Sequence, residues 1–301
     1  MKPQAGDQFQ WHPMAQVFDG QGREQRAVRQ VLPVITDRPG TVGLACAFAA
    51  AGQGFRIGGS GPPPARGEVP MFETLTGGST GQPRRIRRTQ ASWIGSFNVN
   101  ARLFGTGPGA SVAVLGRLIH SLALYGAVEG VHLGAEVHLL DDLSPDRQAF
   151  ALATCRITHL YATPAQLRLL LATGEALAPD LRYVLIGGSK LDTPLRSRVS
   201  AFSPNAAIHE FYGAAETSFI TLTDATTPEG SVGRPYPGVE VDLRAGEVWI
   251  RSPYLFEGYA SDPGSARWDG GWLSVGETGS WAGDALVLMG RAGRMVTVAE
   301  Q

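Results

Sequence analysis

The chain has 301 residues, a formal net charge of −1 and two cysteines, Cys46 and Cys155, and this length supports one large or two medium domains with a substantial core. Two cysteines outside any C-x-x-C motif exclude a disulfide scaffold and a cysteine-built zinc site. The balanced charge lacks the excess of Lys and Arg that is typical of nucleic-acid-binding proteins. No apolar run reaches about 18 residues and no signal-peptide core opens the sequence, so we expect a cytoplasmic protein with no membrane span.

The first 88 residues are irregular in pattern. Residues 21–32 show a weak helical spacing, and residues 52–70 are rich in glycine and proline and are predicted as a loop. Residues 71–76 alternate like a strand, and the basic run at 84–88 is predicted as a strand with a solvated face.

From residue 89 onward, helical and strand patterns alternate. Helices are predicted over residues 89–104, 120–133, 144–154, 163–174 and 193–202, and strands over residues 110–115, 136–140, 157–162, 181–186 and 206–212. This alternation is typical of layered α/β folds with a parallel sheet.

After residue 215 the pattern changes to short strands separated by Gly, Pro and Asp turns, over residues 218–223, 240–243, 247–251 and 285–289. We therefore expect an α/β fold in two parts. Residues 1–220 form layered parallel-sheet subdomains, and residues 221–301 form a β-rich subdomain shaped as a distorted barrel.

The segment from Leu75 to Arg84 carries the clearest chemical signal. It interleaves glycines with hydroxyl side chains, in the order Thr76, Gly77, Gly78, Ser79, Thr80 and Gly81. Backbone N–H and hydroxyl groups of such a loop can converge on phosphate oxygens, with Arg84 adding positive charge. The spacing is not that of a P-loop NTPase, and taken alone the segment also fits a solvated turn.

Further motifs follow in order along the chain. They are a histidine, His120, before a helix; the pair Gly187-Gly188 after a strand; Phe-Tyr-Gly-Ala-Ala-Glu, with Tyr212, Gly213 and Glu216; Asp-Gly-Gly-Trp-Leu-Ser-Val-Gly-Glu, ending at Glu277; and Gly290-Arg291. With the loop, they resemble the motifs of the adenylate-forming superfamily, which includes acyl- and aryl-CoA synthetases, luciferases and peptide-synthetase adenylation domains.

The resemblance implies a role for each of these residues. Nucleotide-binding residues would be Thr76, Gly78, Ser79, Thr80, Gly81, Gly187, Gly188, Tyr212, Gly213, Glu277 and Arg291. Tyr212 would lie against adenine, Glu277 and Arg291 would hold the ribose, and Glu216 would bind Mg²⁺. His120, Glu216 and Thr80 would be the catalytic residues.

Four positions depart from the family pattern. This chain has Gly77 where the family has a serine, Arg84 in place of a lysine, Ala215 in place of a threonine, and Glu277 in place of an aspartate. Together they motivate an alternative hypothesis, a non-catalytic module that binds a nucleotide or an acyl-adenylate. A glycine-rich phosphotransferase, which would release ADP, is a third alternative.

The implied reaction is ATP-dependent activation of a small carboxylic acid to acyl-AMP, followed by thioester formation with CoA or the phosphopantetheine of an acyl carrier protein. The family's small C-terminal lid domain, with its catalytic lysine, has no counterpart in the sequence, and neither Lys2 nor Lys190 can replace that lysine. We therefore expect this chain to bind ATP or acyl-AMP but to adenylate slowly.

Overall fold

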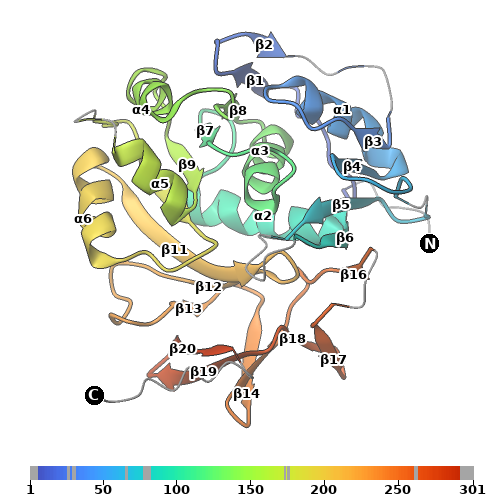
Figure 1. The fold of residues 1–301 in the computed structure, drawn as a ribbon, viewed down its shortest axis with the longest axis vertical. Helices are drawn as coiled ribbons and strands as arrows, with labels where there is room; N and C mark the ends of the chain where they lie inside the picture. Colours follow the sequence, from blue (N-terminus) through green and yellow to red (C-terminus); the bar gives the residue numbers. More distant parts are fainter. Residues whose placement is uncertain are drawn as a thin grey trace.

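The computed structural model describes residues 6–25, 28, 32–64, 67–76, 83–172, 174, 177–260 and 264–291, with Arg291 described by its backbone only. Three sheets organise the chain (Figure 1). The largest has nine strands in the order β13-β12-β11-β10-β9-β7-β8-β1-β2. Their bounds are β1 Gln16–Asp19, β2 Glu24–Gln25, β7 Ser111–Val114, β8 Glu136–Leu139, β9 His159–Ala162, β10 Tyr183–Ile186, β11 Ala207–Ala214, β12 Ser218–Leu222 and β13 Arg234–Pro235.

The six central strands of this sheet, from β1 to β11, run parallel, and helices cover both faces. The helices are α1 Val42–Ala50, α2 Gln90–Phe104, α3 Ser121–Leu133, α4 Pro145–Thr154, α5 Pro164–Leu171 and α6 Thr193–Phe202. Successive residues of β7 alternate between two cores, because Val112 and Val114 pack with α2 and α3 whereas Ala113 packs with α4, α5 and α6. None of the described helices is long and apolar enough to cross a membrane.

The second sheet has five strands in the order β16-β6-β5-β4-β3. Its strands are β3 Val34–Ile35, β4 Phe55–Ile57, β5 Met71–Leu75, β6 Arg85–Thr89 and β16 Gly258–Tyr259. β16 comes from the distant C-terminal part of the chain and pairs with β6, with Gly258 opposite Arg87. The loop predicted to bind phosphate connects β5 to β6.

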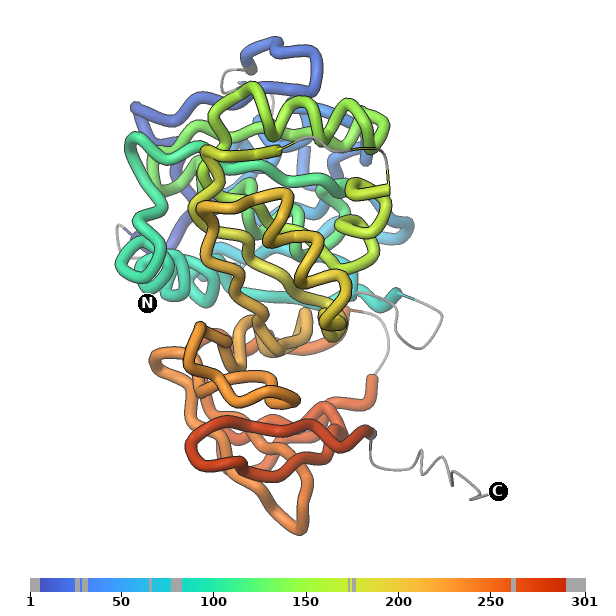
Figure 2. The backbone as a smooth tube through the Cα atoms, turned by 90° about the vertical axis from the view of Figure 1, so that its left-hand side faces the viewer, coloured from blue at the N-terminus to red at the C-terminus, as the bar shows by residue number. Residues whose placement is uncertain are grey.

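The third sheet is antiparallel and forms the lower lobe in Figure 2. It contains β14 Glu240–Arg244, β15 Glu247–Arg251, β17 Arg267–Asp269, β18 Trp272–Ser274, β19 Glu277–Ala282 and β20 Ala285–Arg291. The predicted class, a layered α/β part followed by a β-rich part, is confirmed. The boundary at residue 220 remains a prediction.

Three predictions about the first 88 residues are wrong. The helical pattern over residues 21–32 does not form a helix at Glu24–Gln25, which is strand β2. The predicted loop over 52–70 contains β4, whose residues are all buried, and the end of a short 3₁₀ helix, Ala51–Gln53. The basic strand does not present a uniformly solvated face, because Arg88 is fully buried.

A buried polar network joins α2, α3 and β9. Its centre is Glu129, which has no exposed surface and accepts hydrogen bonds from the Asn100 amide, at 2.7 Å, and from the Tyr161 hydroxyl. The Tyr236 hydroxyl donates to Asn100 at 2.6 Å. Because burial disfavours the charged carboxylate, the pKa of Glu129 rises to about 7, although its hydrogen bonds oppose the shift.

This network predicts a pH-dependent stability. An unfolded Glu129 ionises near its ordinary pKa whereas the folded one holds its proton up to about pH 7, so folding takes up a proton between these values. The free energy of unfolding should therefore fall as pH rises through this window, by on the order of 3 kcal/mol from this group. Glu129→Gln should remove this part of the pH dependence, and denaturant unfolding of both proteins from pH 4 to 8 checks it. If the free energy of unfolding depended on pH in the same way in both proteins, this prediction would be contradicted.

The chain reverses direction between β11 and β12. β11 pairs in parallel with β10 and antiparallel with β12, and the pairing register shifts between Tyr212 and Gly213. The two strands approach so closely that a Cβ atom on Gly213 would lie 1.9 Å from the carbonyl oxygen of Ser218. The backbone cannot move away without breaking the β11–β12 pairing, so this position requires glycine.

We accordingly expect Gly213→Ala to lower the free energy of unfolding by about 3 kcal/mol or more, because its methyl group meets backbone atoms rather than a movable side chain. Gly43→Ala is the matched control, since its Cβ would meet only Leu118 Cδ1 at an ordinary 3.9 Å. Thermal and denaturant unfolding of both variants measure the difference. Equal stabilities would show that the reversal tolerates a side chain.

Candidate functional site

The base of the predicted phosphate-binding loop is closed by two hydrogen bonds. Thr76 N donates to Arg84 O at 2.9 Å, and Arg84 N donates to Thr76 Oγ1, also at 2.9 Å. These contacts place Thr76 at the end of β5, where the loop begins. The other predicted loop residues, Gly78, Ser79, Thr80 and Gly81, lie outside the described residues.

His120 lies beside this loop base. It forms a parallel bridge with Leu75, and the next residue, Ser121, donates its hydroxyl to Leu75 O at 2.9 Å. The imidazole of His120 is exposed and makes no capping hydrogen bond at the start of α3. The bridge thus places His120 beside Leu75, the residue that precedes Thr76.

Gly187 and Gly188 follow β10 at the carboxyl end of the parallel sheet. A Cβ on Gly187 would lie 2.1 Å from Phe211 Cζ, so the absence of a side chain here makes room for that ring. Gly188 has a φ of +91°, which favours glycine. Gly187 therefore borders β11, which carries Tyr212, whereas Gly188 lies beside Thr163 at the start of α5.

The turn after β11 carries Glu216 and is closed by two hydrogen bonds between its own residues. Thr217 N donates to Ala214 O at 3.1 Å, and Ala214 N donates to Thr217 Oγ1 at 2.9 Å. Glu216 is also held from outside the turn: its backbone oxygen accepts from Phe256 N at 2.8 Å, and its Oε1 accepts from the Tyr259 hydroxyl at 2.9 Å.

Tyr259 contacts the candidate site residue Glu216 but is not among the residues predicted from sequence. Burial, and after it the negative charge of Glu216, raises the pKa of its phenol. The guanidinium carbon of Arg84 lies 5.8 Å from the centre of its ring. Spacing alone does not reveal the contact between Tyr259 and Glu216, because the two residues lie 43 positions apart in the sequence.

The two residues predicted to hold the ribose face each other across a hairpin. Glu277 begins β19, and its Cα is paired with that of Arg291 at the end of β20. The Tyr212 hydroxyl donates a hydrogen bond to Glu277 Oε2. The candidate adenine and ribose residues therefore meet, although Tyr212 comes from the first sheet and Glu277 from the third.

The donor set suits a magnesium ion that is shared with a nucleotide. No three His, Cys, Asp or Glu side chains gather as a metal cage within the described ranges. Magnesium bound with nucleotide phosphates takes one or two protein carboxylates and completes its shell with phosphate oxygens and water. The half-buried carboxylate of Glu216 has the chemistry that such a site needs.

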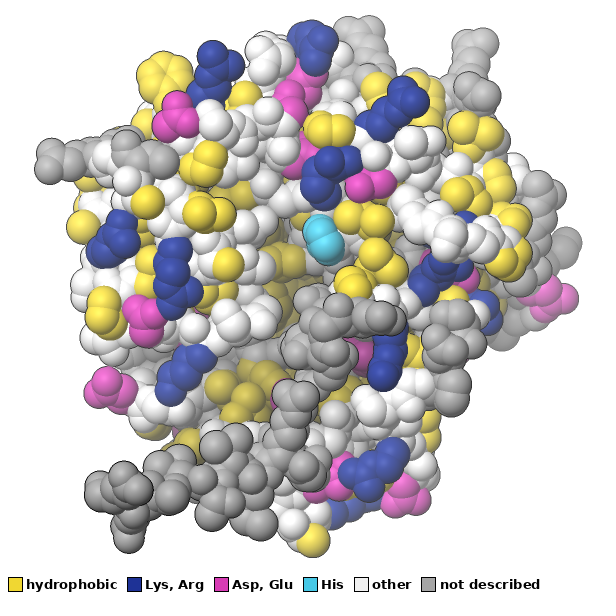
Figure 3. Space-filling view, in the orientation of Figure 1, with side chains coloured by type: hydrophobic (Ala, Val, Ile, Leu, Met, Phe, Trp, Pro, Cys, Tyr) yellow, Lys and Arg dark blue, Asp and Glu magenta, His cyan; other side chains and the backbone are white. Residues whose placement is uncertain are grey.

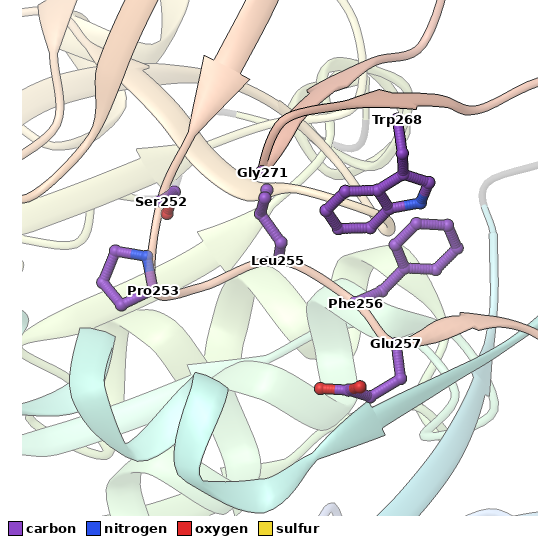
Figure 4. Close-up of a pocket in the computed structure, with 7 residues that line it drawn as sticks. All are labelled: Ser252, Pro253, Leu255, Phe256, Glu257, Trp268 and Gly271. Atoms are coloured by element: carbon purple, nitrogen blue, oxygen red, sulfur yellow. The ribbon is translucent and has the colours of Figure 1, made fainter.

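Figure 3 shows one face of the molecule, where hydrophobic side chains lie in a recess between the upper layers and the lower lobe. An open hollow of about 400 Å³ lies near β17 and is lined by Ser252, Pro253, Leu255, Phe256, Glu257, Trp268 and Gly271 (Figure 4). None of these lining residues is a predicted site residue, so we do not assign the nucleotide to this hollow.

The family model described as AMP-binding enzyme matches residues 17–260. The uncharacterized acyl–CoA ligase YhfT of Bacillus subtilis (strain 168) is 29% identical over 215 residues, covering 67% of this chain and 45% of the relative. The 3-hydroxybenzoate–CoA ligase of Aromatoleum sp. (strain CIB) is 27% identical over 250 residues, covering 76% and 47%. The chain spans about half the length of these curated relatives.

Solved structures of O-succinylbenzoate CoA synthetases share the fold. A variant of E. coli MenE with bound OSB-AMS superposes with a TM-score of 0.69 at 21% identity, covering 87% of this chain and 67% of that one. MenE from Bacillus subtilis in complex with ATP and a magnesium ion gives a TM-score of 0.64 at 22% identity, covering 73% and 50%. With the family model matching most of its length, this chain belongs to the AMP-binding enzyme family.

Proposed function

We propose that this chain is the nucleotide-binding part of an acid–thiol ligase, which activates a carboxylic acid with ATP and Mg²⁺. The observation that carries the proposal is the convergence of Thr76, His120, Tyr212, Glu216 and Glu277 from three sheets, together with membership of the AMP-binding enzyme family. In this assignment Tyr212 lies against the adenine, and Glu277 with Arg291 binds the ribose.

In the first step, a carboxylate oxygen of the acid attacks the α-phosphorus of ATP. A bond forms between that oxygen and phosphorus, the bond from phosphorus to the bridging oxygen breaks, and pyrophosphate leaves with the electron pair. The protein's contribution is positioning and electrostatic stabilisation. The loop from Thr76 to Gly81 and the charge of Arg84 would stabilise the leaving pyrophosphate, while exposed His120 would border the acid.

Magnesium, when bound, neutralises charge on the phosphates, and Glu216 is the residue that would hold it. The Tyr259 hydroxyl and the Phe256 amide fix the Glu216 side chain and backbone, so the carboxylate is oriented before nucleotide binds. A metal-binding side chain that is already held in place loses less conformational entropy when the ion binds.

The second step would transfer the acyl group from AMP to a thiol, releasing AMP and a proton. The similarity to acyl–CoA ligases supports CoA as the acceptor. A phosphopantetheine thiol of a carrier protein has the same chemistry and is the alternative acceptor. The nature of the acid remains to be found with a panel of aliphatic and aryl carboxylic acids.

Product analysis separates the candidate functions. We expect slow, acid-dependent formation of AMP and pyrophosphate, with hydroxylamine trapping the acyl-AMP as a hydroxamate. Release of ADP would indicate a phosphotransferase instead. Nucleotide binding by calorimetry without pyrophosphate release would indicate a binding module, which the similarity to ligases disfavours. Failure of the chain to bind ATP would contradict the proposal.

Glu216→Gln should lower the rate of hydroxamate formation about 100-fold and raise the magnesium concentration needed for half-maximal rate, because the amide loses the negative charge. Glu229→Gln is the control, since Glu229 is exposed and is not part of the β11–β12 turn. An unchanged magnesium requirement in Glu216→Gln would remove Glu216 from the metal site.

A further inference from the structure

Arg88 is a fully buried cation in the middle of the molecule. It lies on β6, none of its surface is exposed, and arginine is rarely buried without partners. Its Nη2 donates to Ser218 Oγ at 2.8 Å and to the Tyr254 carbonyl oxygen, and its Nη1 donates to the Ala215 carbonyl oxygen. The guanidinium carbon also lies 5.9 Å from the centre of the Trp93 ring.

The charge on Arg88 is retained at neutral pH. Burial lowers its pKa to about 9, and the nearby Glu216, Tyr125 and Glu257 oppose this shift. The ion pairs found among the described residues do not include Arg88, so two carbonyl oxygens and one hydroxyl solvate its charge. A guanidinium fork can reach several acceptors at once, which the single ammonium of lysine cannot do.

These acceptors belong to the two segments that hold Glu216. Ala215 and Ser218 flank it in the β11–β12 turn, and Tyr254 precedes Phe256, whose amide donates to Glu216 O at 2.8 Å. Ser218 has a φ of +57°, a left-handed conformation that is strained for a residue with a side chain. The hydrogen bond from Arg88 to its hydroxyl helps to hold the residue in this conformation.

We propose that Arg88 is a positioning residue that fixes Glu216 relative to the phosphate-binding loop. β6 begins directly after that loop, at Arg85, so Arg88 ties the turn carrying Glu216 to the strand on which the loop is anchored. Glu216 and the described base of the loop, Thr76 and Arg84, are then joined through β6. The functional part of this inference rests on the proposed function, whereas the mechanical part can be tested without nucleotide.

The mechanical test is amide hydrogen exchange on the nucleotide-free chain. Arg88→Lys should speed exchange about tenfold in residues 214–219 and 253–257, because the donors of one ammonium nitrogen cannot span the acceptors that the two Nη atoms reach, and should leave α3 unchanged. Arg87→Lys is the matched control on the same strand, since Arg87 lies half-exposed 3.6 Å from Glu73. Unchanged exchange in both segments of Arg88→Lys would overturn the proposal.

The functional test compares two nucleotides by calorimetry. Arg88→Lys should weaken binding of Mg–ATP about tenfold and leave the affinity for AMP without metal unchanged, since AMP lacks the phosphates that Glu216 would serve. A merely structural loss would weaken both nucleotides equally. Equal weakening of both, or no weakening of either, would overturn the positioning role.

Ser218→Ala covers the case in which Arg88→Lys does not fold. It removes one acceptor and leaves the buried guanidinium in place, so the same selective loss of Mg–ATP affinity is expected, about threefold in size. Equal affinities of wild type and Ser218→Ala for Mg–ATP would then overturn the proposal. A wild-type chain that binds neither nucleotide would contradict the proposed function, and hydrogen exchange would still decide whether Arg88 fixes the turn.

Discussion

The reversal of the chain after β11 is the constraint on which the site depends. β11 is the last strand to pair in parallel, and β12 returns antiparallel along its other edge. The reversal brings Gly213 so near to Ser218 that only glycine fits. One turn thereby ends the parallel part of the sheet, places Glu216 at its carboxyl edge, and sends the chain toward the lobe that supplies Glu277. The switch in sheet topology and the predicted metal ligand thus both lie between Gly213 and Ser218.

The layered part of the fold could be predicted from sequence because its strands are buried on both faces and its helices are periodic. The bounds of α6 were predicted to the residue, and those of α2 and α3 differ by a single residue. The errors lie where pairing is non-local. β4, Phe55–Ile57, has an arginine at its centre, and only its position between β3 and β5 makes it a strand. The burial of Arg88 likewise depends on carbonyl groups supplied by distant segments.

The candidate site could be predicted in its members but not in its contacts. The motifs that resemble the family single out Tyr212, Glu216 and Glu277, although Tyr212 lies within β11, Glu216 in the turn after it, and Glu277 at the start of β19. Spacing does not show that the Tyr212 hydroxyl donates to Glu277, since that contact depends on how two separate sheets pack. The longer side chain of Glu277, a departure from the family's aspartate, finds a partner there. Tyr259 was overlooked for the same reason, because its partner lies on another element.

The buried guanidinium of Arg88 also bears on the order of events during synthesis. Its acceptors lie 127, 130 and 166 residues further along the chain. Taking an ion out of water without partners costs several kcal/mol, so this face of β6 must stay hydrated until the segment around Tyr254 has left the ribosome. At about 5–20 residues per second, this delay is on the order of ten seconds. The five-stranded sheet that contains β6 therefore forms late, although four of its strands are synthesised early. Arg88 disfavours burial of β6 until the residues that accept its hydrogen bonds have been synthesised.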